Sequence, residues 1–267
     1  LNETITCKGT WDTLSPPARC WIAPNGSHGP LDISGAIEHS CNYFFYEVGY
    51  RLSRNNGVYD SDTGLEKLAY YADQFGLSDK SGVEISESAP KVSDFDAIRS
   101  AIGQGTNNYS TVGLARYVTT VANSGSCYNL SLLSKATDAD GNLIADYTPT
   151  LRNTVDLKQS TWDAIHQGMR KVVEDKDYYK DLTIQVAGKT GTAQENRKRA
   201  NHALFVCYAP YEQPQIAIAT RIAFGYASDY AAQVTKDIVK YYFKLEDESS
   251  LITGTAESTN VVQSAGD

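Results

Sequence analysis

The segment Val186-Ala187-Gly188-Lys189-Thr190-Gly191-Thr192-Ala193-Gln194 constrains this 267-residue chain more than any other stretch. Residues 182–186 before it alternate in character and are partly β-branched, which predicts a half-buried strand. Two glycines flank the lysine, so another molecule can lie close against the backbone there. A lysine, two hydroxyls and bare N–H groups would face that space. Together they suit a bound carboxylate or a developing oxyanion.

Two other interpretations of Gly188-Lys189-Thr190 need weighing. The tail of a phosphate-binding P-loop would require a glycine five positions before Gly188. The residue there is Thr183, which excludes a P-loop. An ordinary edge strand with one solvated lysine stays open while these three residues are taken alone. The functional interpretation therefore depends on a second motif elsewhere in the chain.

Ser40-Cys41-Asn42 supplies that second motif. It lies at the junction of two apolar helical stretches within residues 33–52, each with one buried stripe. Asn42 could instead be a plain helix N-cap by composition. A functional Ser-x-Asn motif requires Ser40 and Asn42 to point into a cleft while Cys41 points away.

The order of the motifs points to a known family. Lys-Thr-Gly and Ser-x-Asn are two of the three motifs of penicillin-binding proteins and class A β-lactamases. Ile102-Gly103-Gln104-Gly105 and Ala122-Asn123-Ser124-Gly125 lie between them, and His202 to Pro210 follow. The chain resembles the transpeptidase domain of a class B penicillin-binding protein, most closely the elongation- or sporulation-specific branch, up to about Phe243. The resemblance implies an α+β fold: an antiparallel sheet flanked by helices, an all-helical lobe, and an active site in the groove between them.

The resemblance also implies catalytic roles for three residues. Ser40 would bridge Lys189 and the lysine of a Ser-x-x-Lys motif, and would pass a proton to the leaving amine. Asn42 would hold the acyl-chain amide of the donor peptide. Lys189 would keep the local potential positive, which favours an anionic substrate and the hydroxyl form of Ser40.

The same resemblance assigns substrate binding to Thr190, Gly191 and Thr192. The two threonines would bind the terminal carboxylate of the donor peptide. The backbone N–H of Thr192 would be one of two oxyanion donors, and the second would come from the nucleophilic serine.

The nucleophile itself is not evident in this sequence. Ser88-Ala89-Pro90-Lys91 formally matches Ser-x-x-Lys. That motif needs a helical turn that puts serine and lysine on one face, and Pro90 makes an interior helical turn costly. We therefore expect the nucleophile upstream of Leu1. On this interpretation residues 1–245 are the C-terminal portion of a transpeptidase domain.

The activity implied by the resemblance is that of a peptidoglycan D,D-transpeptidase. It would cross-link stem peptides through a serine acyl-enzyme and would be acylated by β-lactams. One alternative is a β-lactamase-type hydrolase or a β-lactam-binding sensor; a hydrolase would need a deacylating carboxylate, for which Glu84 and Glu87 are the nearest candidates. A second alternative is a non-catalytic scaffold for cell-wall synthesis, against which the joint presence of Ser40, Asn42 and Lys189 argues.

Charge and hydropathy bear on partners and location. The net charge of −8 and a pI near 5.1 disfavour a nucleic-acid partner. No apolar run reaches the roughly 18 residues of a membrane span, and no signal peptide opens the sequence. The resemblance implies a protein at the extracytoplasmic face of a bacterial membrane, anchored by an N-terminal helix outside this chain. It also implies a membrane glycosyltransferase partner.

The first 32 residues carry a candidate metal site. They lack a clear period and are rich in turn residues, and they include Cys7, Cys20, His28 and Asp32. Thiolate, imidazole and carboxylate are the ligands of zinc, and four would close a tetrahedral structural site ahead of Ser40. Cys41 could compete for one place. A Cys7–Cys20 disulfide, or two unrelated thiols beside a hydrogen-bonded His28, are the alternatives.

The remaining chain predicts further elements from its periodicity. The expected helices cover residues 60–75, the stretch after Gly105 up to Gly125, 158–173 and 228–243. The expected strands are 203–208 and 215–222, with a β-hairpin within 130–149 around Asp138 to Asn142. Residues 246–267 are polar and without period, which predicts a disordered tail.

Overall fold

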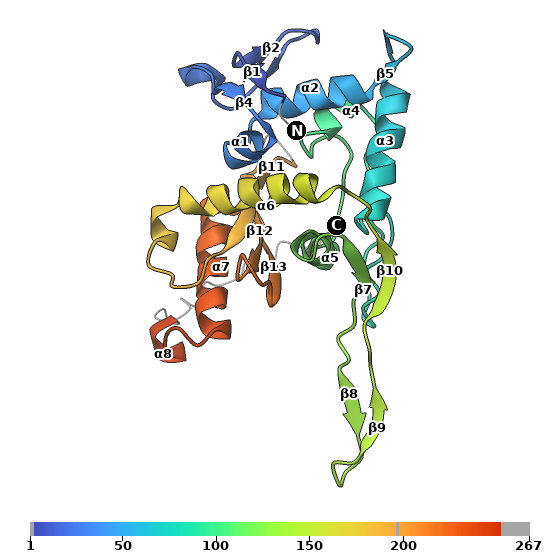
Figure 1. Ribbon diagram of the computed structural model, residues 1–267, viewed down its shortest axis with the longest axis vertical. Helices are drawn as coiled ribbons and strands as arrows, with labels where there is room; N and C mark the ends of the chain where they lie inside the picture. Colours follow the sequence, from blue (N-terminus) through green and yellow to red (C-terminus); the bar gives the residue numbers. More distant parts are fainter. Residues whose placement is uncertain (1–2, 196–197, 252–267) are drawn as a thin grey trace.

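Three antiparallel strands organise the protein. In the computed structural model, which describes residues 3–195 and 198–251, β11 (Ala187–Ala193), β12 (His202–Ala209) and β13 (Ile216–Ile222) form one sheet in that order (Figure 1). Among the described residues β11 pairs with β12 alone. It therefore lies at an edge of this sheet, and one side of the Lys-Thr-Gly strand is open to neighbouring elements.

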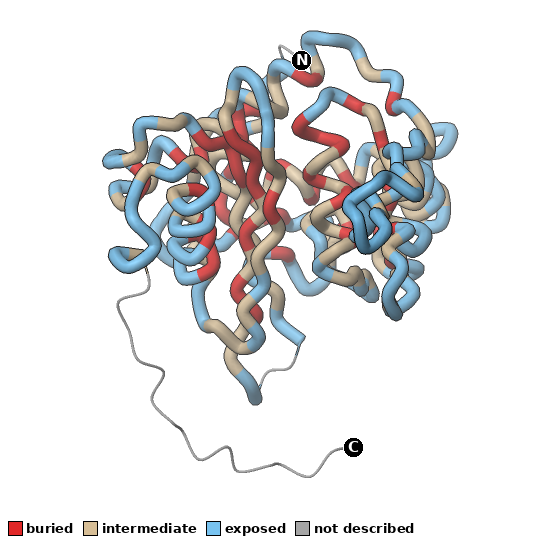
Figure 2. The backbone as a smooth tube through the Cα atoms, turned by 90° about the horizontal axis from the view of Figure 1, so that it is seen from below, coloured by how far each residue is buried: buried red, intermediate tan, exposed pale blue. Residues whose placement is uncertain are grey.

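The sheet is covered by helices on both faces. Because successive side chains of a strand point to opposite faces, Phe205 and Cys207 of β12 pack toward α7 (Ser228–Tyr242). Tyr208 of β12 packs instead with α5 (Thr111–Ala122) and α6 (Gln159–Glu174). Figure 2 shows the buried residues in the interior of the molecule, with exposed segments around them. The predicted α+β fold is confirmed.

A separate helical lobe lies beside the sheet. It contains α2 (Asn42–Leu52), α3 (Ser61–Gln74) and α4 (Ala97–Ser100), which pack against one another. Gly49 and Gly64 allow this close approach, since a Cβ at Gly49 would lie 2.9 Å from the Cβ of Ala101 and one at Gly64 would lie 2.8 Å from the Cβ of Ala97. The all-helical lobe predicted from the resemblance is therefore present.

A fully buried arginine ties this lobe to the sheet helices. The Arg116 guanidinium in α5 donates hydrogen bonds to the carbonyl oxygens of Gly76, Asp79 and Lys80 and pairs with the Asp79 carboxylate at 2.8 Å. A buried cation without such partners would be costly. The loop after α3 is thereby fixed against α5.

A short helix, α1 (Ile33–Glu38), sets the position of the Ser-x-Asn motif. The Asp32 carboxylate caps it by accepting a hydrogen bond from the Gly35 N–H at 2.8 Å. Ser34 Oγ donates to the Ala164 carbonyl of α6 at 2.8 Å. Gly168 of α6 lets the two helices touch, because a Cβ there would lie 2.8 Å from Ile37 Cβ.

The remaining elements are short and peripheral. Figure 1 shows the hairpin β8–β9 projecting away from the body beyond the pair β7–β10. Their bounds are β1 (Ile5–Cys7), β2 (Thr10–Trp11), β3 (Ala18–Arg19), η1 (Ala23–Asn25), β4 (Gly29–Leu31), β5 (Arg54–Asn55), β6 (Val58–Tyr59), β7 (Ser126–Asn129), β8 (Lys135–Thr137), β9 (Leu143–Asp146), β10 (Thr150–Thr154), η2 (Asp177–Tyr179) and α8 (Glu248–Leu251).

Most predicted elements are present, and two predictions are wrong in part. Residues 182–186 were predicted as a strand, but β11 begins only at Ala187. Leu182 and Ile184 are partly buried because they pack against the sheet core. The predicted disorder from Glu246 onward fails for Glu248–Leu251, which form α8. Residues 252–267 of that predicted tail lie outside the described residues.

No helix within residues 3–195 and 198–251 combines the length and the apolar character needed to cross a bilayer.

The close contact between α1 and α6 predicts that Gly168→Ala destabilises the protein. Alanine favours helices intrinsically, but its methyl would overlap Ile37, and overpacking costs about 1–3 kcal/mol. The free energy of unfolding from urea titration measures the loss. The exposed neighbour Gln167→Ala is the control and should stay within about 0.5 kcal/mol of the wild type. Equal stability of Gly168→Ala and the wild type would contradict the close packing.

Candidate active site and metal centre

Ser40 lies in a tight turn between α1 and α2. Its backbone φ is +49°, a region that non-glycine residues adopt at an energetic cost and that often occurs at functional sites. The turn is held by the Ser40 N–H on the Ile37 carbonyl at 3.2 Å and the Cys41 N–H on the Ala36 carbonyl at 3.0 Å. Cys41, and not Asn42, is the N-cap of α2, so the N-cap interpretation of Asn42 is wrong.

The structure brings Ser40 and Lys189 together across 149 residues of sequence. Lys189 Nζ donates a hydrogen bond to Ser40 Oγ at 2.8 Å and a second to the Thr190 carbonyl oxygen at 3.1 Å. The edge strand β11 thus faces the turn between α1 and α2. The two sequence motifs form one site.

The Lys189 amine lies in a poorly solvated position. Burial lowers its pKa from the ordinary 10.5 to about 8, and the nearby Lys176 charge adds to the effect. The amine is therefore mostly protonated at pH 7, and it loses its charge within a pH range in which an ordinary lysine keeps it. Such a group provides positive potential and can also exchange a proton with Ser40.

The other predicted site residues lie close by. Asn42 is the first residue of α2, and Thr190, Gly191 and Thr192 follow Lys189 in β11. Among residues 3–195 and 198–251, no partner accepts or donates a side-chain hydrogen bond at Asn42 or Thr192. Their polar atoms are therefore available to a ligand.

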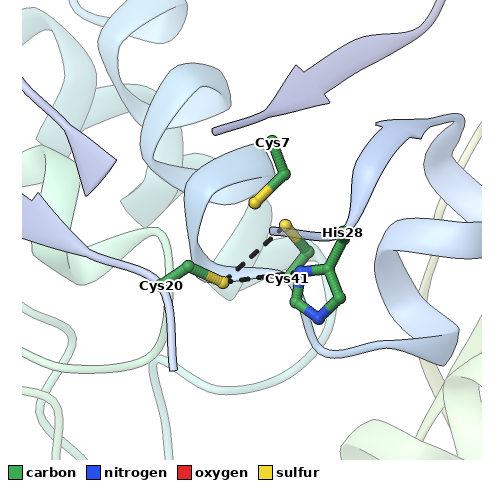
Figure 3. Close-up of side chains that lie close together, drawn as sticks. All are labelled: Cys7, Cys20, His28 and Cys41. Atoms are coloured by element: carbon green, nitrogen blue, oxygen red, sulfur yellow. Dashed lines mark hydrogen bonds between the residues drawn. The ribbon is translucent and has the colours of Figure 1, made fainter. Parts of the chain in front are cut away.

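Four metal-ligating side chains, one of them Cys41 directly after Ser40, gather at one point (Figure 3). The thiols of Cys7, Cys20 and Cys41 and a ring nitrogen of His28 all lie within 4.8 Å of one another. Cys20 Sγ is 3.6 Å from His28 Nδ1 and 4.0 Å from Cys41 Sγ. The three cysteines are buried.

Two sequence-based expectations differ from this arrangement. Asp32 is not in the cluster, because its carboxylate caps α1 at the Gly35 N–H; Cys41 takes the fourth place. Cys7 and Cys20 are free thiols, so the alternative of a disulfide between them is not realised.

The chemistry of the cluster fits a thiophilic metal ion. The hydrogen bond between the Cys20 and Cys41 thiols lowers the pKa of Cys20 to about 4 and raises that of Cys41. One thiolate is therefore already favoured, and the thiolate is the metal-binding form. His28 Nε2 is buried and has no hydrogen-bond partner among the described residues. Three sulfurs and one imidazole match a Cys₃His zinc set.

Sequence reasoning missed two residues at this site. Trp21 donates its indole N–H to the His39 carbonyl at 3.0 Å, and the rings of His28 and His39 stack with centroids 5.6 Å apart. The residues on both sides of Ser40 are thus tied to the cysteine cluster. The sequence offered one signal for these residues, which is that His39 directly precedes Ser40.

The candidate carboxylates of the hydrolase alternative are engaged elsewhere. Glu87 accepts hydrogen bonds from Ser110 Oγ at 2.5 Å and from Ser81 at 2.8 Å. Glu84 accepts from Ser131 Oγ at 2.5 Å. Both carboxylates thus hold loops. The segment from Ser88 to Lys91 is not helical, and Lys91 pairs with Asp94 at 3.0 Å.

Comparison with known proteins identifies the class. The model of the penicillin binding protein transpeptidase domain matches residues 1–240. The chain belongs to this family, as the motif order predicted, and its relatives are class B penicillin-binding proteins.

Individual relatives are distant but align over most of the chain. Penicillin-binding protein 2B of Streptococcus pneumoniae is 25% identical over 274 residues, which cover 91% of this chain and 40% of that protein. Peptidoglycan D,D-transpeptidase MrdA of Haemophilus influenzae is 28% identical over 279 residues, covering 90% of this chain and 41% of that protein. The chain thus spans about two fifths of the curated relatives it matches.

Solved structures share the fold. Penicillin-binding protein 2B from S. pneumoniae superposes with a TM-score of 0.78 at 24% identity, covering 92% of this chain and 44% of that one. The imipenem acyl-enzyme complex of penicillin-binding protein A from M. tuberculosis gives 0.76 at 20% identity, covering 90% and 55%.

Burial of Lys189 predicts a titration near pH 8 that does not depend on Ser40. In Ser40→Ala the pKa of Lys189 should stay well below 10.5, because burial is its main cause. NMR of ¹³C-dimethylated lysines measures it, and Lys189→Arg assigns the signal. In urea the pKa should return to about 10.4. A pKa near 10.4 in the folded protein would contradict the buried placement.

Proposed function

We propose that this chain is the C-terminal portion of a peptidoglycan D,D-transpeptidase that cross-links stem peptides through a serine acyl-enzyme and is acylated by β-lactams. The 2.8 Å hydrogen bond between Lys189 and Ser40 carries this proposal, because it joins the two family motifs in one site. We also propose that the protein acts in cell elongation or in sporulation, because its motifs resemble those of that branch of the family.

The proposed roles follow from the chemistry of each group. Ser40, held by the Lys189 ammonium, passes a proton to the leaving amine. Asn42 and Thr192 have free polar atoms, which suit the donor's amide and its terminal carboxylate. The Thr192 N–H serves as one oxyanion donor, a contribution worth about 3 kcal/mol to the transition state. Thr190 and Gly191 complete the strand against which the donor peptide lies.

A hydrolase is the weaker candidate, since Glu84 and Glu87 are both bonded to loop groups. A scaffold without chemistry would have no need for a partly desolvated lysine on a serine in a costly backbone conformation.

We also propose a location and a partner. One group of relatives is named peptidoglycan D,D-transpeptidase, which favours the extracytoplasmic face of a bacterial membrane and an anchor supplied by a segment not in this chain. One fold neighbour is described as a peptidoglycan synthase complex that coordinates polymerization and crosslinking. A membrane glycosyltransferase is the corresponding partner proposed here, and no nucleic-acid partner is expected at a net charge of −8.

Removal of the Lys189 amine should prevent acylation. In the native protein including the residues before Leu1, Lys189→Ala should lower the second-order rate constant for fluorescent penicillin about 100-fold or more. The amine that holds Ser40 and keeps the site positive would be lost, and removal of one preorganised donor from an active site has an effect of this size. Lys135→Ala on the projecting hairpin is the matched control and should label normally. Wild-type labelling of Lys189→Ala would remove Lys189 from the mechanism.

The same reagent tests the position of the nucleophile. Intact-mass analysis should find a penicilloyl adduct on the native protein and none on residues 1–267 alone. An adduct on residues 1–267 would place the nucleophile within them, with Ser88 the first serine to examine.

We propose a structural zinc ion as the cofactor, held by Cys7, Cys20, His28 and Cys41. Bound there, it would supply a rigid cross-link between the N-terminal segment and the first turn of α2. Because its ligand Cys41 directly follows Ser40, the ion would also fix the Ser40 turn.

The zinc proposal predicts about one zinc per chain, measured by elemental analysis of purified protein. Cys20→Ser should lose the metal and lower the melting temperature, because structural zinc contributes folding free energy. Asp32→Asn is the discriminating control: it should retain zinc, since Asp32 only caps α1. A zinc content near zero in the wild type would overturn the proposal, and zinc lost in Asp32→Asn alone would restore Asp32 as a ligand.

A further inference from the structure

Three side chains just before Ser40 form a second metal-ligating group. A carboxylate oxygen of Glu38, a ring nitrogen of His39 and a carboxylate oxygen of Asp175 lie within 4.8 Å of one another. Glu38 ends α1, His39 is its C-cap, and Asp175 is the C-cap of α6. The group therefore lies where the two packed helices end side by side, and it shares no residue with the cysteine cluster.

These groups are available to a ligand. His39 Nε2 is 3.8 Å from the Glu38 carboxylate, beyond hydrogen-bond distance. Among the described residues, neither the His39 ring nor the Asp175 carboxylate makes a side-chain hydrogen bond. The one competing contact is the Lys171 ammonium, 3.5 Å from Glu38. A cation could enter without breaking a hydrogen bond.

The local charge favours a cation. The C-terminal end of a helix carries partial negative charge, and α6 is 16 residues long. Asp175 stands at this end, where a carboxylate is unfavourably placed, whereas its neighbour Glu174 is paired with Arg170 at 3.3 Å. Lys171, half exposed, offsets Glu38 only loosely. A bound divalent ion would attract both the carboxylates and the negative helix end, and would thereby offset the repulsion between them.

The histidine is held in position before any ion arrives. Its ring stacks on that of His28 with an interplanar angle of 7°, and Trp21 holds its carbonyl at 3.0 Å. A ligand whose orientation is already fixed loses less entropy on binding. Ligand atoms on a tetrahedral metal stand about 3.4 Å apart. The exposed Asp175 side chain can move to close the remaining gap.

We propose that Glu38, His39 and Asp175 bind a divalent first-row cation, Mn²⁺ or Zn²⁺, with water completing its shell. One imidazole and two carboxylates suit the harder ions, whereas the thiolate-rich cluster selects zinc. The ion fastens the end of α1 to the end of α6 one residue from Ser40. This inference does not depend on the transpeptidase assignment.

Mn²⁺ is the probe that separates the two sites. The purified protein is titrated with Mn²⁺ and free Mn²⁺ is measured by EPR, while elemental analysis follows zinc. One Mn²⁺ should bind per chain. His39→Gln and Asp175→Asn should each weaken this binding at least tenfold, whereas Lys171→Met should tighten it several-fold, because a competing ammonium is gone. Asp146→Asn on β9 is the control and should change nothing.

The outcomes are decisive in both directions. Unchanged Mn²⁺ affinity in His39→Gln and Asp175→Asn overturns the proposal. If either variant misfolds, as shown by its far-UV circular dichroism, Lys171→Met decides, since it removes no ligand. Tighter Mn²⁺ binding in Lys171→Met then supports the site, and equal or weaker binding overturns it.

Discussion

The hydrogen bond between Lys189 and Ser40 is the interaction on which the arrangement of this protein depends. It joins the edge strand of the sheet to a turn at the border of the helical lobe. Neither partner is in a relaxed state: burial disfavours the lysine charge, and Ser40 has a positive φ. Both conditions persist only if the surrounding elements are rigid.

Rigidity around Ser40 cannot come from α1 itself. A helix of six residues is not stable alone in water. It is held by the Asp32 cap at its start, the Ser34 bond to α6 and the contact at Gly168. The cysteine cluster then acts from the far side of Ser40 through Cys41. The serine is thus fixed from both directions along the chain.

Sequence reasoning located the motifs but could not place every side chain around them. Ser-x-Asn and Lys-Thr-Gly are readable because each needs particular residue types in a fixed order. Asp32 and Cys41 were both chemically suited to a metal, and only the fold separates a helix cap from a ligand. The strand start at Ala187 was missed for a similar reason: residues 182–186 carry a strand pattern, but their burial arises without a ladder partner.

The charges near Ser40 connect the metal chemistry to the function. The anionic substrate of the proposed function would need positive potential at Lys189. The surroundings of Ser40 include the Cys20 thiol, whose thiolate is favoured, and the carboxylates of Glu38 and Asp175. Zinc would leave its three thiolate ligands with a net charge of −1, and a divalent cation at Glu38 and Asp175 would offset the two carboxylate charges there. Cation binding at these two groups would therefore do more than stabilise the backbone around Ser40. It would also keep negative potential away from the place where the proposed function has a carboxylate bind.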